Sequence, residues 1–419
     1  MAGPATNTSY DALLKEVWPQ EDIYDELYDI NESFYGMCPK DTGFYEKYRH
    51  IAVGHGHTQG ISADFASAKA NKNPSVQDEF KISPVTYYSF FSIQRQLLRR
   101  AQQKKAAILP ALDRETRMAI HGWKRMTGIY LANVSGVGDL GRLTAASTVT
   151  GTTATLRNVA DTKHFYKGMT IELSVDNTGS AGVKASSSPL RISKIDRESG
   201  VLTFETNINT AVPTAAASDY LYRAGDYNNV VKGIYAWVPI ATPSATTFFG
   251  LDRTTDPQLL GGWRVVCTGL APRAALKKTL KVLKEIGSKP THAFLSPNDY
   301  LNLTMEIEST GVTKSVKEPA AAIGKYKWGT PFEGIEVMGP AGPVKVMFDI
   351  NLIDNYPLVT QLNTWTFATM GDAPYFDETD GNRILRETDA DAYEGRFIGD
   401  MQLYNEAPGF SAIALLVGS

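Results

Sequence analysis

The sequence predicts an α+β protein made of several units, and three observations support that fold class. Apolar residues at helical spacing over residues 110–134 indicate one long amphipathic helix. Short alternating segments separated by threonine, serine and glycine fill residues 148–239 and indicate a small β domain. From about residue 259, helical patterns alternate with short strands. A chain of 419 residues also exceeds what one hydrophobic core usually serves, so two or three domains are expected.

The helix expected over residues 110–134 carries a continuous apolar stripe along one face. Pro110 suits the first turn of a helix, and the pair Ser135-Gly136 is expected to end it. At about 1.5 Å per residue the helix is roughly 35 Å long, so other elements should pack along its side. We call it the spine helix. Its expected core residues are Leu112, Ala119, Trp123, Met126 and Tyr130.

The first 45 residues are acidic and rich in aromatic side chains. Such a segment cannot build its own core, yet it is too apolar for a free tail, so we expect it to lie along another surface. Residues 10–32 carry eight acidic residues against one lysine, a net charge of −7, whereas residues 89–125 have a net charge of +7. A basic helix is expected over residues 93–107, just before the spine helix. The opposite charges predict complementary surfaces.

Residues 46–92 are expected to form a long two-stranded excursion, because glycines and small polar residues separate short pieces with few apolar anchors. Long segments of this kind usually have a function. In the β domain, residues 196–200 lie between two alternating segments and predict a hairpin turn. Further along, we expect a helix over residues 272–286 that stops at Gly287, a strand near residues 293–295, and a helix that begins at Ser296.

The composition excludes some classes of protein. A formal net charge of −3 argues against a chain dedicated to binding nucleic acid. Cys38 and Cys267 are too few and too far apart for a disulfide framework or a zinc site, so a reducing compartment is expected. The N-terminus does not have the pattern of a secretory signal, and no run approaches the roughly 18 apolar residues of a membrane span. We therefore expect a protein made in the cytoplasm that does not enter a membrane.

One motif associated with nucleotide binding occurs in an unsuitable place. Gly136, Gly138 and Gly141 match the pattern GxGxxG, but a helix precedes it and a threonine-rich strand follows. A phosphate cradle needs the reverse order, so a plain helix-to-strand turn is favoured. No nucleophile elbow, Walker A sequence, HExxH motif or CxxC pair occurs. We expect no catalytic site, no cofactor and no metal.

Two further clusters were weighed against surface roles. His50, His55 and His57 have a spacing that can chelate a metal, but no carboxylate or thiol completes the site, so a solvated loop is favoured. An acidic patch near the C-terminus could serve a hydrolase, yet its spacing fits neither a calcium loop nor a carboxylate pair, so a solvated or subunit-facing surface is favoured. The patch consists of Asp372, Asp377, Glu378, Asp380, Asp389, Asp391 and Glu394.

The order of these segments resembles the major capsid protein of tailed bacteriophages, the Hong Kong 97 type. The resemblance covers nearly the whole chain and is carried by AILPALDRETRMAIHGWKRMTGIYLANVSGVGDLGRL, GMTIELSVDN, SKIDRESGVLTF, FFGLDRTTDPQLLGGW, ALKKTLKVLKEIGSKPTHAFLSPNDYLNL and TDADAYEGRFIGDMQLYNEAPGFSAIALL. It implies an N-terminal arm (1–45), an extended loop (46–92), a peripheral domain (93–147) containing the spine helix, an axial domain (240–370) and return strands (371–419). The β domain at 148–239 is an insertion that the minimal fold lacks.

The resemblance implies a structural protein that is not an enzyme. Copies would assemble into hexamers and pentamers of an icosahedral head around packaged double-stranded DNA, in the virion, after synthesis in the bacterial cytoplasm. Portal and scaffolding proteins, a decoration protein and non-specific contact with DNA are implied as further partners. Two alternatives remain, namely an encapsulin-like compartment shell and a β-rich hydrolase that uses the C-terminal carboxylates.

The charges and aromatic residues predict how copies touch. We expect the arm to lie on the basic helix of its own or a neighbouring copy, with aromatic side chains supplying affinity and charges supplying register. The competing interpretation places the basic helix against packaged DNA. Lys69 and Lys72 of the extended loop are candidates for contacts, including a covalent link to a neighbour that some relatives form. The arm residues are Trp18, Glu21, Asp22, Tyr24, Asp25, Glu26 and Phe34, and the basic residues are Arg95, Arg99, Arg100 and Lys104.

Overall fold

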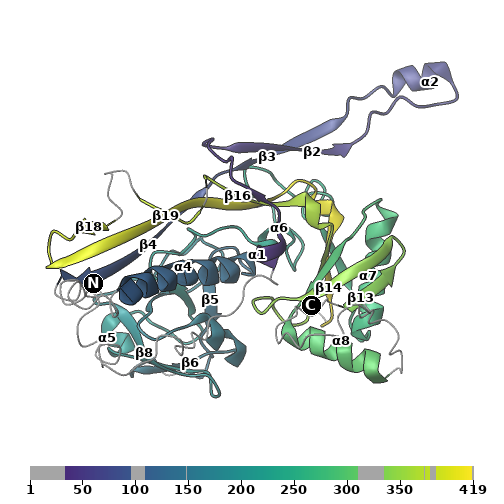
Figure 1. Ribbon diagram of the computed structural model, residues 1–419. Helices are drawn as coiled ribbons and strands as arrows, with labels where there is room; N and C mark the ends of the chain where they lie inside the picture. Colours follow the sequence, from purple (N-terminus) through teal and green to yellow (C-terminus); the bar gives the residue numbers. More distant parts are fainter. Residues whose placement is uncertain are drawn as a thin grey trace, which may run out of the picture.

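The computed structural model describes residues 34–95, 109–147, 149–309, 335–371, 373–377 and 384–417. It has a mixed α and β architecture with four parts (Figure 1). A long sheet runs over the spine helix, a β domain lies on the other side of that helix, an α/β lobe lies beside them, and a two-stranded hairpin projects away from the body. In the described part of the chain, no helix combines the length and apolarity needed to cross a membrane.

The spine helix is α4, Leu109–Leu131, which ends three residues earlier than the expected residue 134. The helix stops because the Asn133 side chain caps the following turn, where its Oδ1 accepts the Gly136 N–H at 2.8 Å. Gly136 has φ +66°, and a Cβ there would lie 2.8 Å from the Cβ of Ala236, so only glycine fits. The GxGxxG motif is therefore a helix-to-strand turn, as predicted.

The expected core residues of the spine helix divide between two hydrophobic cores. Trp123 packs in the core of the main body, whereas Met126 and Tyr130 pack in the core of the β domain. Ala119 is only half-buried, and the side chain of Leu112 lies outside the described residues. The helix thus serves both cores, which explains why its apolar stripe is wide.

The long sheet is built on one extended antiparallel pair. β4 (Val85–Gln94) pairs with β19 (Ala392–Asn405) along its whole length. Gly399 of β19 allows α4 to pack closely, because a Cβ there would lie 2.7 Å from the ring of Trp123. The remaining strands are β1 (Lys40–Asp41), β16 (Trp365–Thr369), β17 (Tyr375–Phe376) and β18 (Ile384–Arg386).

The start of the predicted basic helix is wrong. Ile93 and Gln94 are the last residues of β4, and Ile93 is buried opposite Tyr393 of β19. The aromatic and β-branched side chains before them favour a strand that packs on the core. The rest of that prediction falls on residues 96–108, which lie outside the described residues.

The inserted β domain is a closed six-stranded barrel. Its strands follow the order β5, β10, β7, β8, β9, β6, and a bridge between Leu143 and Leu156 joins the last strand to the first. The Arg157 N–H also donates to the Arg142 carbonyl at 2.7 Å across this closure. The barrel strands are β5 (Asp139–Arg142), β6 (Thr153–Thr155), β7 (Thr170–Ser174), β8 (Leu190–Asp196), β9 (Val201–Phe204) and β10 (Tyr220–Arg223).

The barrel differs in extent from the predicted range of 148–239. It begins at β5, nine residues before the expected boundary, because the strand follows the glycine turn directly. Beyond β10 the chain leaves the barrel, and α6 (Ile234–Trp237) is buried in the main core instead. The predicted hairpin turn is confirmed, since β8 and β9 flank residues 197–200 and Gly200 has φ +72°. Two short elements complete the barrel, η1 (Val159–His164) and α5 (Ile208–Ala211).

The α/β lobe contains a six-stranded sheet with two helices. α7 (Pro272–Glu285) and α8 (Pro297–Ser309) confirm the predicted helices, and the Ser296 hydroxyl accepts the Asp299 N–H at 3.1 Å to begin α8. The sheet order is β11 (Trp263–Val266), β20 (Ser411–Leu415), β15 (Leu358–Thr360), β12 (His292–Leu295), β14 (Gly342–Phe348) and β13 (Ile335–Gly339). The lobe is not the continuous range 240–370, because β16 belongs to the long sheet and β20 returns to the lobe from the C-terminal segment.

The projecting hairpin is formed by β2 (Arg49–Gly56) and β3 (Val76–Ile82), which confirms the two strands of the predicted excursion. The excursion ends before the expected residue 92, because β4 begins at Val85 and pairs with β19 in the long sheet. A short helix, α2 (Phe65–Ala70), lies at its far end, well away from the body (Figure 1). The chain enters the described region at α1 (Phe34–Met37), and short 3-10 turns, η2 (Leu362–Thr364) and η3 (Pro408–Phe410), precede β16 and β20.

Candidate subunit interfaces

The root of the hairpin is fixed firmly to its own chain. Phe80 and Ile82 of β3 are fully buried, and the ring of Phe80 meets that of Trp237 edge to face at 5.1 Å between centroids. The Lys81 N–H donates to the carbonyl of Phe249 at 2.8 Å. The alternation of β3 therefore directs its apolar residues into the core near the body.

The far end of the hairpin has the opposite character. Ile61 is 94% exposed and Phe65 is 81% exposed, on a segment that touches no core of its own chain. The tip is nevertheless ordered locally, because the Asp64 carboxylate caps α2 by accepting the Ser67 N–H at 2.8 Å. Lys69 and Lys72 are exposed beside these residues. An ordered, exposed apolar tip is a candidate interface with another protein.

Sequence reasoning did not single out Ile61 or Phe65. The signal was available, because they are the only large apolar residues between His55 and Val76, a stretch of otherwise small or polar residues. Their exposure could not be read from the sequence, since an isolated apolar residue in a loop usually packs back on the protein. The structure removes that option by placing the tip far from the body (Figure 1).

The hairpin histidines pair with carboxylates across the two strands. His50 Nδ1 lies 3.1 Å from an oxygen of Glu79, and His55 Nε2 lies 2.5 Å from an oxygen of Asp78. His57 has no such partner among the residues described and lies near the end of the strand. Among those residues no group of three potential ligands is placed to hold a metal ion. The pairs instead link β2 to β3 across the hairpin, one near its root and one further out.

A second exposed apolar surface lies on the long sheet. Tyr88 is 58% exposed and Phe90 is 56% exposed, and their rings stack at 6.3 Å between centroids. The guanidinium of Arg396 lies 5.8 Å from the ring of Phe90. Alternation explains the arrangement, because Phe91 and Ile93 of the same strand point inward. We call Tyr88 and Phe90, with Tyr375 on β17, the sheet patch.

Phe34 does not behave as an inter-subunit contact. It is 1% exposed and lies inside its own chain, with its ring edge to face against Phe294 at 5.3 Å and Trp365 at 5.4 Å. Its N–H donates to the Asp349 carboxylate at 3.0 Å. A residue held this way is not available to a neighbouring copy. The other predicted arm residues, Trp18, Glu21, Asp22, Tyr24, Asp25 and Glu26, lie outside the described residues.

Of the predicted basic residues, the structure describes only Arg95. Its Nε lies 2.8 Å from a carboxylate oxygen of Asp391, so this arginine pairs within its own chain. Glu394 pairs with Arg396 at 2.5 Å. Two members of the C-terminal acidic patch are therefore engaged in ion pairs, which gives no support to a carboxylate pair in a hydrolase. Arg99, Arg100, Lys104, Asp372, Glu378 and Asp380 lie outside the described residues.

The combination of a projecting hairpin, a long sheet on a spine helix and an α/β lobe defines the class of protein: the chain has the fold of the major capsid proteins of tailed bacteriophages. A chain of the cyanophage A-1(L) capsid asymmetric unit superposes with a TM-score of 0.50 at 12% identity, covering 97% of this chain and 98% of that one. No protein-family model matches the sequence, and no curated protein matches it.

Two further solved structures show lower similarity. A capsid chain of the native GTA particle covers 100% of both chains with a TM-score of 0.46 and 10% identity. The holo-SrpI encapsulin from Synechococcus elongatus covers 90% of this chain and 82% of its own, with a TM-score of 0.41 and 9% identity. At such identities the likeness concerns the fold.

Proposed function

We propose that this chain is the major capsid protein of a tailed bacteriophage, a structural protein whose copies form hexamers and pentamers of an icosahedral head around packaged double-stranded DNA. One observation carries the proposal: the hairpin exposes Ile61 and Phe65 at a tip that its own chain cannot cover. Exposed apolar side chains of this kind are stabilised only when another surface buries them. Because the chain has a capsid fold, we infer that this other surface belongs to a second copy of the chain.

The contact between copies is head-to-tail. The tip of one hairpin and the surface that receives it are different parts of the chain, and such heterologous contacts close into rings. The sheet patch is the receiving surface that we favour, because it offers exposed aromatic rings to the apolar tip. In family terms the hairpin is the extended loop, residues 1–45 are the arm, and the α/β lobe is the axial domain around the ring axis.

The remaining partners follow from the same proposal. Portal and scaffolding proteins, and a decoration protein, would contact the shell, which is assembled in the bacterial cytoplasm and ends in the virion. The basic residues Arg99, Arg100 and Lys104 contact either the acidic arm or the packaged DNA without sequence specificity. Reversing the charges of Arg99 and Arg100 distinguishes the two: loss of shell assembly supports the arm, and loss of salt-sensitive DNA binding by the subunit supports DNA.

Particle size tests the proposed function. We expect the purified full-length chain to elute as hexamers or as particles of megadalton mass, with nucleic acid inside heads recovered from infected cells. A 46 kDa monomer that persists at high protein concentration would contradict the proposal. A denaturing gel of assembled particles tests the covalent link through Lys69 or Lys72, because a single monomer band excludes it.

A further inference from the structure

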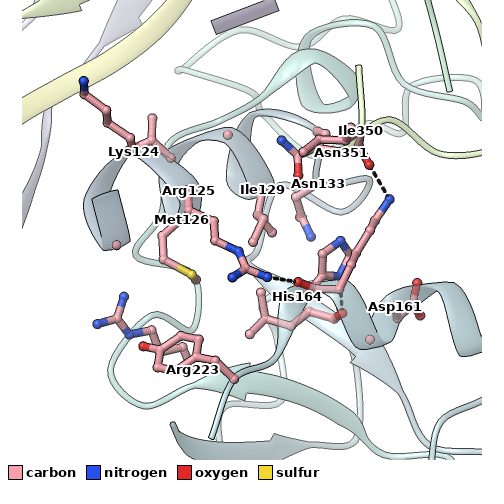
Figure 2. A pocket seen from close by; sticks show the side chains of 18 of the residues that line it. Lys124, Arg125, Met126, Ile129, Asn133, Asp161, His164, Arg223, Ile350 and Asn351 are labelled. Atoms are coloured by element: carbon pink, nitrogen blue, oxygen red, sulfur yellow. Dashed lines mark hydrogen bonds between the residues drawn. The ribbon is translucent and has the colours of Figure 1, made fainter. Parts of the chain in front are cut away.

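A cavity of about 1200 Å³ lies where the spine helix, the barrel and the lobe meet (Figure 2). Its walls come from α4, from η1 of the barrel and from residues 350–355, which follow β14. Small-molecule sites usually measure roughly 300–1,000 Å³, so the size favours an extended peptide segment. The barrel supplies one wall, so the cavity exists because of the insertion.

The walls of the cavity are apolar and cationic. Met118, Met126 and Ile129 of α4 supply apolar surface. Arg125 of α4 and Arg223 at the end of β10 come from facing walls (Figure 2). Their chemistry suits a ligand with both carboxylate groups and aromatic rings.

The cationic side chains of the cavity differ in their hydrogen bonds and ion pairs. Arg125 donates to the carbonyl of Lys163, and Lys163 Nζ donates to the carbonyl of Ile350 at 2.6 Å, which ties barrel and lobe together (Figure 2). Within the described part of the chain, Lys124 forms no ion pair, and Arg223 is attracted by the nearby carboxylate of Asp226 without a direct ion pair. Positive charge therefore remains for an acidic ligand.

Three carboxylates, those of Asp139, Asp161 and Asp354, line the cavity together with four cations, Lys124, Arg125, Lys163 and Arg223. Asp139 is engaged by the side chains of Ser135 and Asn133. Burial raises the pKa of Asp161 to about 6, so its charge is held less readily than that of an ordinary carboxyl. Asp226 is not part of the lining, but its carboxylate attracts the Arg223 guanidinium and accepts a hydrogen bond from the Tyr130 hydroxyl. Four cations against three carboxylates leave the lining with a formal excess of one positive charge, the sign that favours an anionic segment.

The described part of the chain begins at Phe34, beside this cavity. Phe34 is fixed by its buried ring and by the hydrogen bond from its N–H to Asp349, and Asp349 directly precedes the cavity wall at residues 350–355. Any chain that leads into Phe34 therefore arrives close to the cavity. Residues 10–32 carry a net charge of −7 together with Trp18 and Tyr24, which matches the cationic and apolar walls.

We propose that the acidic arm, residues 10–32, docks in this cavity of its own copy. Its carboxylates lie toward Arg223 and its aromatic rings lie against the methionines of α4. Docking of the arm here leaves packaged DNA as the partner of the basic helix, which is one of the two outcomes of the Arg99 and Arg100 charge reversal described above. The inference does not rest on shell assembly, because arm and cavity belong to one chain.

Limited proteolysis of the full-length chain tests the docking. Chymotrypsin should cut the arm at Trp18, Tyr24 or Tyr28 about tenfold faster in Arg223→Glu than in wild type, because cleavage follows the population of the undocked arm. Lys277→Glu is the matched control, since Lys277 is exposed on α7 of the lobe, and it should leave the rate unchanged. Equal rates in wild type and Arg223→Glu would overturn the proposal.

A second variant protects the test against misfolding. The double substitution Asp25→Lys and Glu26→Lys alters only the arm and should also speed cleavage about tenfold. Thermal unfolding of each variant shows whether the body is intact. If the arm variant is cut at the wild-type rate, the docking is refuted whatever the fate of Arg223→Glu.

Isotope mixing identifies the copy that supplies the arm. Chains labelled with ¹⁵N are mixed with unlabelled chains before assembly and treated with a carbodiimide, which joins Lys124 to nearby carboxylates. Links from Lys124 to the arm should contain one label only. Pairs with mixed labels would place the arm in a neighbouring copy and overturn the same-copy assignment, while leaving the proposed shell function intact.

Discussion

The inserted barrel and the projecting hairpin are both built from short antiparallel strands. They differ in whether the strands close on themselves and in whether their apolar side chains are buried. The barrel closes on itself through Leu143 and Leu156 and fills its interior with apolar side chains. The hairpin pairs only β2 with β3 among the described strands and exposes Ile61 and Phe65. A two-stranded ribbon is marginally stable alone, so the hairpin needs a partner molecule, whereas the barrel core is completed by side chains of α4 from its own chain.

The largest expected effect comes from the tip of the hairpin. Ile61→Asp with Phe65→Asp should abolish particle formation, because each contact loses an apolar anchor worth about 2 kcal/mol or more and every copy repeats the loss. The free energy of unfolding of the subunit should not change, since both side chains are already exposed to water. Size-exclusion chromatography and chemical denaturation measure the two quantities.

Gln59→Ala serves as the control for the tip, because it removes an exposed polar side chain close to Ile61 without removing an apolar anchor. It should assemble normally. If the double aspartate variant formed particles of normal size, the hairpin tip would not need another copy to bury Ile61 and Phe65.

The next effect concerns the root of the hairpin. Phe80→Ala should lower the free energy of unfolding by about 3–5 kcal/mol, as expected for a fully buried aromatic ring. Phe80→Leu should cost less, because it retains part of the buried area. Urea denaturation monitored by tryptophan fluorescence reports the change, since Phe80 contacts Trp237. A loss below 1 kcal/mol would show that the root is as independent of the body as the tip.

The smallest expected effect concerns Asp161, a buried carboxyl group of the barrel. Burial raises the pKa of Asp161 to about 6 from 3.8, so the folded state resists ionisation and stability falls as the pH rises through this interval. Asp161→Asn should therefore stabilise the protein by roughly 1–3 kcal/mol at pH 7, with the gain absent at pH 4. Urea denaturation at both pH values checks the sign. Equal effects at the two pH values would contradict the burial argument.

The elements with strong local signals were predictable from the sequence. The spine helix and α7 followed from regular apolar spacing, and Gly287, at φ +86°, marks the end of α7. The β8–β9 hairpin followed from its turn residues. In each case the deciding interactions lie within a few residues of one another, so the sequence window contains them.

What depended on distant contacts was missed. Closure of the barrel joins strands that reach each other only after the whole domain has formed, and the early start of β5 depends on the same pairing. The local sequence predicts helix at Ile93, but the residue is in a strand because it pairs with Tyr393 of β19, 300 residues away. The exposure of Phe65 and the burial of Phe34 likewise reflect where the fold puts each segment.

The last two strands of the described chain occupy central places in two different sheets. β19 holds the long sheet together, and β20 lies between β11 and β15 in the lobe. Neither sheet can be completed while the ribosome is still translating the segment that contains β19 and β20. The barrel, in contrast, contains all its strands by Arg223 and is free to fold early. A nascent chain therefore lacks both finished sheets until β20 has been translated.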